Sequence, residues 1–295
     1  MSANVVPDFW FLSFADSRLR GPLRRIRRQA HSMGVFGDHV RVWTEQDLDE
    51  SFRERMRDHL VPGSRGYGFW AWKPQVILQI FREMPEGDVL LYVDAGCHLN
   101  PKGVPRLLEY RELAREHGLV TFQARALGEA AKTDPALHFL PDAEWSKGDL
   151  LDFFGVRGKD EVLRTGQMGG GIFLVRKCAQ THAFFEEFRS VFYDHFELCD
   201  DSPSVSPNLP GFHENRHVQS VLSLLCKRNR SFSLSCAEYS PIGDFIPKDR
   251  SIDPAEWPTS WHDLRNRPIW ARHDKGGWRA LIPDSVKKLV GRILR

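Results

Sequence analysis

Cysteine is scarce in this chain, and the cysteines are not arranged in closely spaced pairs. There are five cysteines, an odd number, and no Cys-x-x-Cys motif occurs. Such a set argues against a disulfide framework and against a zinc ribbon. Since disulfides are rare in reducing compartments, we expect free thiols and a cytoplasmic protein.

Long hydrophobic runs are absent as well. No apolar stretch approaches the roughly 18 residues that a membrane-spanning helix needs. The first ten residues, MSANVVPDFW, contain no basic segment followed by a long apolar run. We therefore expect neither a transmembrane helix nor a secretory signal peptide.

No charge of one sign dominates. Lysine and arginine number 41 against 39 aspartates and glutamates, so the composition gives no general attraction to nucleic acid. The Gly-x-Gly-x-x-Gly fingerprint is missing too, which argues against a dinucleotide site. The predicted helix Leu19–Met33 is nonetheless rich in arginine. For that helix an anionic partner, nucleic acid included, and a plain solvated face both stay open.

What the sequence contains is an alternation of strands and amphipathic helices. The order is strand, helix, strand, helix, strand, over Phe9–Phe14, Leu19–Met33, His39–Trp43, Asp47–Leu60 and Val89–Val93. This order predicts the first half of a parallel sheet. Further elements are predicted as helices over Val104–Glu116, Ala179–Phe196 and Arg216–Arg230, and as strands over Leu119–Gln123, Ile172–Arg176 and Phe232–Cys236. We expect one α/β domain over residues 1–278, with a mainly parallel central sheet flanked by helices.

A single carboxylate stands out at the end of the most apolar strand. Val89–Val93 is a continuous apolar run, typical of a buried parallel strand, and Asp94-Ala95-Gly96 follows it. Open α/β sheets bind ligands at this edge, and Gly96 lets a ligand approach the backbone. The alternative is that Asp94 caps the next turn. The first strand is likewise followed by a carboxylate, in Phe14-Ala15-Asp16. In nucleotide-binding α/β folds the loop at this position contacts the nucleotide; alternatively, Asp16 caps the next helix.

The stretches GYGFWAWKP and GDVLLYVDAGC resemble bacterial nucleotide-sugar glycosyltransferases of the GT-A type, similar to enzymes of lipopolysaccharide and capsule synthesis. Trp145–Asp149, Gln167–Gly171 and Arg216–Ser220 fit the resemblance, which covers most of residues 8–275. It implies a Rossmann-like single domain, a nucleoside-diphosphate sugar donor and a glycan or lipid-linked acceptor. It also implies Mn²⁺ or Mg²⁺ on an Asp-x-Asp motif, of which this chain lacks the second carboxylate.

The resemblance and the chemistry of the reaction together nominate residues for the donor. Breaking a sugar–diphosphate bond requires charge neutralisation on the phosphate and partners for the sugar hydroxyls. The predicted donor-binding residues are Phe14, Ala15, Asp16, Lys73, Asp94, Ala95, Gly96, Lys147, Gln167, Gly169, Gly170, Arg272 and Lys275. For the stretch around Lys147, the alternative is that Ser146 caps a short helix. For residues 169–171, the alternative is a glycine-rich start of a strand.

Acid–base and metal roles fall on fewer side chains. Asp94, Asp149, Glu214 and His217 are the catalytic candidates, because an inverting enzyme needs a base for the acceptor hydroxyl. The family tends to carry aspartate where this chain has Val218, so Glu214 or His217 would take over. The metal candidates are Asp94, His98 and His273, and the alternative is that lysines and arginines carry the phosphate charge. An inactive nucleotide-sugar or glycan-binding protein of the same fold is the second hypothesis.

Residues 279–295 are predicted to form a basic amphipathic helix of their own. Six aliphatic side chains between 282 and 294 share one helical face, and four lysines and arginines lie opposite. Such a helix suits peripheral contact with the inner face of the cell membrane, and packing on the protein's own core is the alternative.

Deleting residues 282–295 should lower binding to anionic liposomes and leave hydrolysis of the free donor nearly unchanged. Each basic residue near an anionic surface contributes about 1 kcal/mol, so added salt should also release the intact protein. Liposome co-sedimentation measures this. A deletion that lowers the melting temperature and both activities together would instead support packing on the core.

Overall fold

The computed structural model describes residues 8–125, 140–241 and 264–272. The strands are β1 (Phe9–Phe14), β2 (Val40–Trp43), β3 (Val89–Val93), β4 (His98–Leu99), β5 (Leu119–Gln123), β6 (Ile172–Arg176), β7 (Phe232–Ser235) and β8 (Ile269–Trp270). The helices are α1 (Arg20–Ser32), α2 (Glu50–Arg55), α3 (Gly66–Phe69), α4 (Trp72–Glu83), α5 (Val104–His117), α7 (Asp142–Trp145), α8 (Gly148–Phe153), α9 (Asp160–Leu163), α10 (Ala179–Asp194) and α11 (Val218–Arg228).

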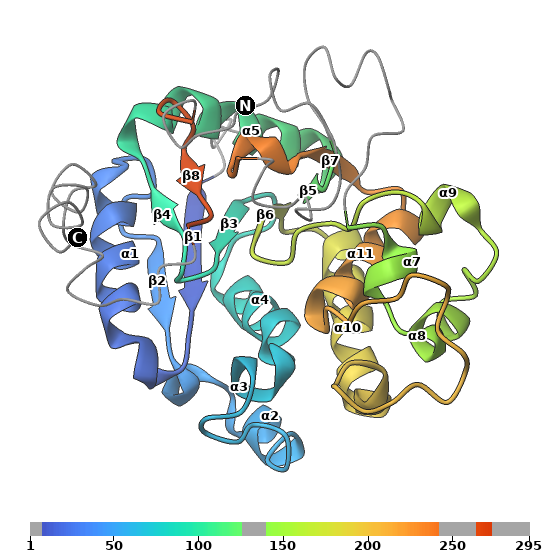
Figure 1. Cartoon of the computed structure of the whole chain (residues 1–295). Helices are drawn as coiled ribbons and strands as arrows, with labels where there is room; N and C mark the ends of the chain where they lie inside the picture. The colour runs from blue at the N-terminus through green and yellow to red at the C-terminus, as the bar shows by residue number, and fades with distance from the viewer. Residues whose placement is uncertain (1–7, 126–139, 242–263, 273–295) are drawn as a thin grey trace, which may run out of the picture.

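A six-stranded sheet in the order β2-β1-β3-β6-β5-β7 forms the centre (Figure 1). β1 pairs in parallel with β2 and β3, and β5 pairs in parallel with β7. Among the described strands of this sheet, only β6 runs antiparallel to its neighbours, β3 and β5. The predicted α/β class with a mainly parallel central sheet is therefore confirmed.

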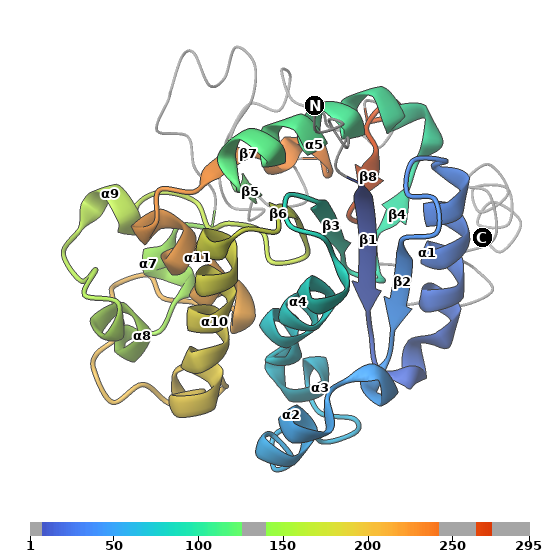
Figure 2. The same ribbon diagram turned by 180° about the vertical axis from the view of Figure 1, so that it is seen from behind.

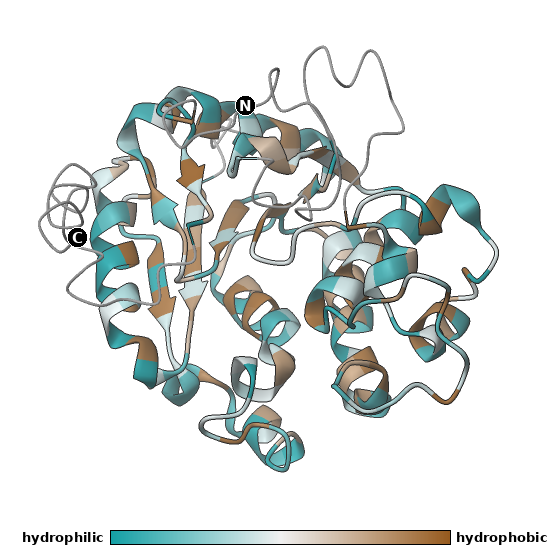
Figure 3. Cartoon of the chain, viewed as in Figure 1, coloured by the Kyte–Doolittle hydropathy of each residue, from teal (hydrophilic) through white to brown (hydrophobic). Residues whose placement is uncertain are grey.

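The central strands are covered on both faces. Every residue of β1 and β3 is buried, as expected for continuous apolar runs in a parallel sheet. Side chains of Trp10, Leu12 and Phe14 join a cluster with α4, α10 and α11. Phe9 and Phe11 point to the other cluster, with α1 and α5. Hydrophobic residues concentrate on these strands and on the inward helix faces (Figure 3).

The flanking helices are amphipathic in the way the spacing predicts. On α1, Leu23, Ile26 and Ala30 are buried, one turn apart, and most of its arginines are exposed. Arg25 is the exception, since it is buried against the loop after β3. The view from behind shows α1 beside β2 and the helices α7–α11 gathered on the opposite side of the molecule (Figure 2). No helix of the described residues is both long and apolar enough to cross a membrane.

Three helices differ from the prediction by two or more residues at an end. The helix expected over Asp47–Leu60 is only Glu50–Arg55, because a short 3₁₀ turn capped by Thr44 ends at Asp47 and leaves Leu48 extended. The helix expected from Arg216 begins at Val218, since His217 has a left-handed φ of 53°. The helix from Ala179 ends at Asp194, before a 3₁₀ turn.

The last described segment, residues 264–272, is fastened to the loop after β4. The side chain of Asn100 donates to the carbonyl oxygens of Arg265 and Arg267 at 2.7 and 2.9 Å. Gly103 is needed at this contact, because a Cβ there would lie 2.2 Å from the backbone nitrogen of Pro268. β8 thereby pairs with β4, which is next in the chain after Asp94. The predicted helix in residues 279–295 lies outside the described residues, so the two-part division of the chain stays a prediction.

Replacing Phe185 by alanine should lower the free energy of unfolding by about 3–5 kcal/mol. Its ring is fully buried, with Phe173 at 5.8 Å and Phe188 at 6.2 Å between centroids. Phe153→Ala is the matched control, because that ring is 45% exposed and should cost about 1 kcal/mol or less. Urea titration of both variants measures the difference, and equal losses would contradict this account of the core.

Candidate functional site

Asp94 follows β3 directly, as predicted, and the site is organised around its carboxylate. Lys73, in the first turn of α4, places its Nζ 2.9 Å from Oδ1 of Asp94. The same ammonium donates to the carbonyl oxygen of Gly170 at 2.5 Å. The Lys73 side chain is 1% exposed and that of Asp94 is 28% exposed. A buried cation therefore holds a carboxylate that is still open to solvent.

Two further residues orient the Asp94 carboxylate. The Tyr92 hydroxyl donates to Oδ1 at 2.7 Å, and burial, reinforced by the charge of Asp94, raises the pKa of this phenol well above its ordinary value. Tyr92 thus keeps its proton and stays a donor. Gly171 lies against the other oxygen, since a Cβ on it would be 2.8 Å from Oδ2. Within the described ranges, no hydrogen bond reaches Oδ2.

Arg25 fixes the loop that follows Asp94. Its Nη2 donates to the carbonyl oxygens of Ala95 and Cys97 at 2.8 and 3.1 Å. Because Arg25 belongs to α1, this contact ties the loop to the first helix of the chain. Ala95 is itself buried, so its side chain is part of the core and only its backbone belongs to the site.

The glycine run, which the sequence assigned to the donor, is brought against Asp94 by β6. A Cβ on Gly169 would lie 2.5 Å from the Tyr239 hydroxyl, and one on Gly170 would lie 3.2 Å from Cβ of Gln219. Gln219, in turn, donates to Oε1 of Gln167 at 2.9 Å. Gln167 is 1% exposed, so its amide serves an internal network that positions the glycines.

Strained backbone gathers on the two segments next to this glycine run. Phe69 and Trp70 have φ values of 53° and 61°, and His217 has 53°. The ring of His217 stacks on Phe69 with 4.8 Å between centroids and lies 5.9 Å from Trp70. Strained residues of this kind cost about 1–3 kcal/mol each and cluster at functional sites. The Trp70 carbonyl also accepts from the backbone nitrogen of Lys73. The strained turn is therefore bonded directly to the lysine that pairs with Asp94.

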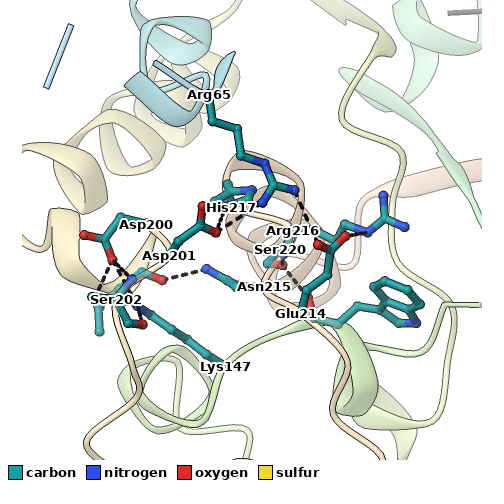
Figure 4. A network of polar contacts seen from close by, with 12 residues as sticks. Arg65, Lys147, Asp200, Asp201, Ser202, Glu214, Asn215, Arg216, His217 and Ser220 are labelled. Carbon is teal, nitrogen blue, oxygen red and sulfur yellow. Dashed lines mark hydrogen bonds and ion pairs between the residues drawn. The ribbon is translucent and has the colours of Figure 1, made fainter. Parts of the chain in front are cut away.

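A polar network surrounds His217 (Figure 4). Nε2 of His217 lies 2.7 Å from Oδ1 of Asp201. Arg65 extends between two carboxylates, 3.3 Å from Asp201 and 3.4 Å from Glu214. Glu214 also pairs with Arg216 at 3.3 Å. The structure therefore joins the catalytic candidates Glu214 and His217 through Arg65 and Asp201.

Burial sets the charge state of this network. Desolvation lowers the pKa of His217 by more than the hydrogen bond to Asp201 raises it. Burial would raise the pKa of Asp201, but His217 and Arg65 outweigh it and leave that pKa below its ordinary value. A neutral imidazole therefore faces an ionised carboxylate near neutral pH.

Lys147 and Asp149 hold the loop between α10 and α11. The buried ammonium of Lys147 donates to the carbonyl oxygen of Ser202 at 3.2 Å. The carboxylate of Asp149 accepts from the backbone nitrogens of Val205 and Ser206 at 2.7 and 2.6 Å. Both side chains therefore bind this loop, and their predicted roles toward the donor stay predictions.

The first loop shows both local caps and a packed ring. Phe14 is buried and packs against Trp72 with 4.1 Å between ring centroids. Asp16 caps the 3₁₀ turn that begins at Ser17 and pairs with Arg18 at 2.7 Å. The capping alternative is thus confirmed for Asp16, and nucleotide contact by this loop stays a prediction.

The described residues do not fit the metal site that the resemblance implies. Oδ1 of Asp94 is already taken by Lys73 and Tyr92. His98 lies on β4, with Nδ1 3.3 Å from the Gln29 amide. Across residues 8–125, 140–241 and 264–272, no three histidine, cysteine, aspartate or glutamate side chains converge on one point. The metal candidate His273 and the donor-binding candidate Lys275 lie outside the described residues, and Arg272 is the last described position there.

Several residues of the site could not be found from the sequence. Tyr92 looked like an ordinary strand residue, although the period-2 alternation of a strand puts it on the same face as Asp94. Arg25 was hidden among exposed arginines of the same helix. Arg65 and Asp201 are 136 positions apart, and no local pattern connects them.

Comparisons with known proteins give structural neighbours only. No family model matches the chain, and no curated protein does. Among solved structures, the chain is similar to mouse xyloside xylosyltransferase 1, with 9% identity, 79% of this chain and 87% of that chain covered, and a TM-score of 0.39. It is also similar to the bifunctional glycosyltransferase WbbM, with 10% identity, 94% and 47% covered, and a TM-score of 0.47.

A third neighbour is core-mannan synthase A from Aspergillus fumigatus in its Mn/GDP form, with 10% identity, 91% of this chain and 85% of that chain covered, and a TM-score of 0.36. This chain spans about half the length of WbbM. At these identities and TM-scores, the likenesses carry no argument about function.

We expect His217 to titrate below about 6.5, the ordinary pKa of histidine. Asp201→Asn should lower this pKa further, because the carboxylate favours the protonated ring. Heteronuclear NMR of the ring nitrogens measures both values. Asp194→Asn, which removes an exposed carboxylate at the end of α10, is the control and should leave the pKa of His217 unchanged. A pKa that rises in Asp201→Asn would contradict the described pairing.

Proposed function

We propose that this protein transfers a sugar from a nucleoside-diphosphate sugar to a hydroxyl of a glycan or lipid-linked acceptor, in the assembly of a surface polysaccharide such as lipopolysaccharide or capsule. The observation that supports this most is the placement of Asp94. A partly exposed carboxylate follows a buried parallel strand, beside glycines and a buried lysine. Ligands of open α/β sheets bind at that edge.

The proposed reaction needs charge compensation at two places. Positive charge develops on the sugar as its bond to the diphosphate breaks, and negative charge grows on the leaving phosphate. Asp94 would bind a hydroxyl of the donor through Oδ2, close to the reacting carbon. Backbone amides around the glycine run and cations of the C-terminal segment, Arg272 and Lys275, would face the diphosphate. No step of this proposal uses a metal ion, because the described ligands do not fit one.

The base for the acceptor hydroxyl would come from the network around His217. Glu214 is the stronger of the two candidates near α11, because its side chain is 42% exposed and an acceptor could reach it, while Arg65 and Arg216 hold it in position. Both oxygens of Asp149 already accept backbone N–H groups. His217 is buried, and it would act by orienting the aromatic turn at Phe69 and Trp70.

One observation favours a second function, that of a binding protein without turnover. Val218, at the position where the family tends to carry aspartate, is 4% exposed and packs in the core. α11 therefore supplies no carboxylate from that position. A nucleotide-sugar or glycan-binding protein of the same fold would have the same Asp94 site and no base.

Thermal shift against a panel of nucleotide sugars, with and without manganese, tests the proposed function. We expect one nucleotide class to raise the melting temperature, because ligands that bind only the folded state stabilise it. Slow hydrolysis of the same donor would separate the enzyme from the binding protein. A protein that responds to none of the nucleotides would contradict the transferase and the nucleotide-sugar-binding protein alike.

Asp94→Asn should reduce transfer or donor hydrolysis by on the order of 100-fold, the scale of losing one key electrostatic contact. Circular dichroism should show the same fold as wild type. The control is Asp49→Asn, which changes a carboxylate of similar exposure that pairs with Arg82 on α4. A folded Asp94→Asn protein with wild-type rates would remove Asp94 from the reaction.

A further inference from the structure

Lys73 already supplies the positive charge that the Asp94 carboxylate needs. Its ammonium lies 2.9 Å from Oδ1 and is 1% exposed. The carbonyl oxygen of Gly170 fixes it from a second side, and the ring of Tyr92 lies 4.9 Å away. A buried ammonium cannot leave this position without losing these contacts, so it is a permanent counter-ion of Asp94.

A divalent cation would bind poorly at the same carboxylate. It would share Asp94 with a fixed positive charge, and like charges in a partly buried site repel strongly. Oδ1 is also occupied by the Tyr92 hydroxyl. Mg²⁺ and Mn²⁺ prefer about six oxygen ligands in octahedral order. The loop Asp94-Ala95-Gly96 offers one carboxylate oxygen, Oδ2, and no second acidic side chain.

The geometry around Oδ2 suits a hydroxyl group instead. Gly171 leaves room next to this oxygen, because any larger residue would place its Cβ 2.8 Å away. The backbone nitrogen of Asp94 donates to the carbonyl oxygen of Gly171 at 2.8 Å, which holds the two backbones together, and Lys73 and Tyr92 orient the carboxylate through Oδ1. An ionised carboxylate is a pure acceptor, so its natural partner is a neutral O–H donor.

We propose that Asp94 is a fixed hydrogen-bond acceptor for a hydroxyl of the bound donor, with Lys73 as its built-in counter-ion, and that Asp94 is not a metal ligand. The identity of that hydroxyl, on a sugar or a ribose, rests on the proposed function. The absence of metal from the Asp94 carboxylate rests on the Lys73, Tyr92 and Gly171 contacts alone.

The test compares manganese binding in wild type, Asp94→Asn and Asp49→Asn. Electron paramagnetic resonance first measures Mn²⁺ alone against each protein. Calorimetry then measures the affinities of UDP, GDP and dTDP with Mn²⁺ and with a chelator. We expect any effect of Mn²⁺ on nucleotide affinity to be the same within about twofold in all three proteins. Asp49 is the matched control, because its side chain is 29% exposed and paired with Arg82.

The outcomes separate this inference from the proposed function. Stoichiometric Mn²⁺ binding that is lost in Asp94→Asn alone would overturn the inference. It would equally be overturned if Mn²⁺ strengthened nucleotide binding about tenfold or more in wild type and Asp49→Asn but not in Asp94→Asn. If no nucleotide binds in any buffer, the proposed function fails together with the donor hydroxyl, and the Mn²⁺ titration still decides whether Asp94 is a metal ligand. Should Asp94→Asn fail to fold with Lys73 unpaired, the neutral pair Lys73→Met with Asp94→Asn replaces it.

Discussion

The ion pair between Lys73 and Asp94 is the contact on which the arrangement of the site depends. It joins the first turn of α4 to the end of β3, and the bond from Lys73 to Gly170 adds the start of β6. Removing one partner of a buried pair leaves an uncompensated charge, which costs about 3–5 kcal/mol. The three segments that form the ligand edge of the sheet are therefore held in place by one ammonium group.

Strain next to this pair gives the site its second constraint. The turn from Tyr67 to Trp70 and the residue before α11, His217, have left-handed φ values that side chains rarely adopt. They persist because Phe69 stacks on His217 and because Arg65 crosses to Asp201 and Glu214. A loop that could relax would lose these contacts, so the α3 turn and the start of α11 are fixed relative to each other.

Most of the fold could be predicted because its signals are local. β1, β3, β5 and β6 have the predicted bounds, since continuous apolar runs between breakers leave little choice of register. The helix expected over Asp47–Leu60 is too long, because Leu48, Phe52, Met56 and Leu60 are buried at helical spacing, whereas the backbone is extended at Leu48 and the helix ends at Arg55. Asp94 could be placed for the same local reason, as the first polar residue after β3.

The partners of Asp94 could not be predicted, because they depend on how the elements pack. Lys73 was one of several cations near aromatic residues, and only the packing of α4 on the sheet shows that it is buried. The freedom of the glycine run to approach a ligand can be predicted from the sequence, whereas the contact of Gly171 with the Asp94 carboxylate cannot. The contacts of Asp149 and Lys147 with the loop between α10 and α11 join residues 55 and 56 positions apart, so no local pattern predicts them.

A crystal structure of the protein with a bound nucleoside-diphosphate sugar tests the central claim most directly. The account predicts a donor hydroxyl within hydrogen-bonding distance of Oδ2 of Asp94, with Lys73 still on Oδ1 and no metal ion on this carboxylate. A donor bound at another edge of the sheet, or a metal ion coordinated by Asp94 with Lys73 displaced, would contradict it.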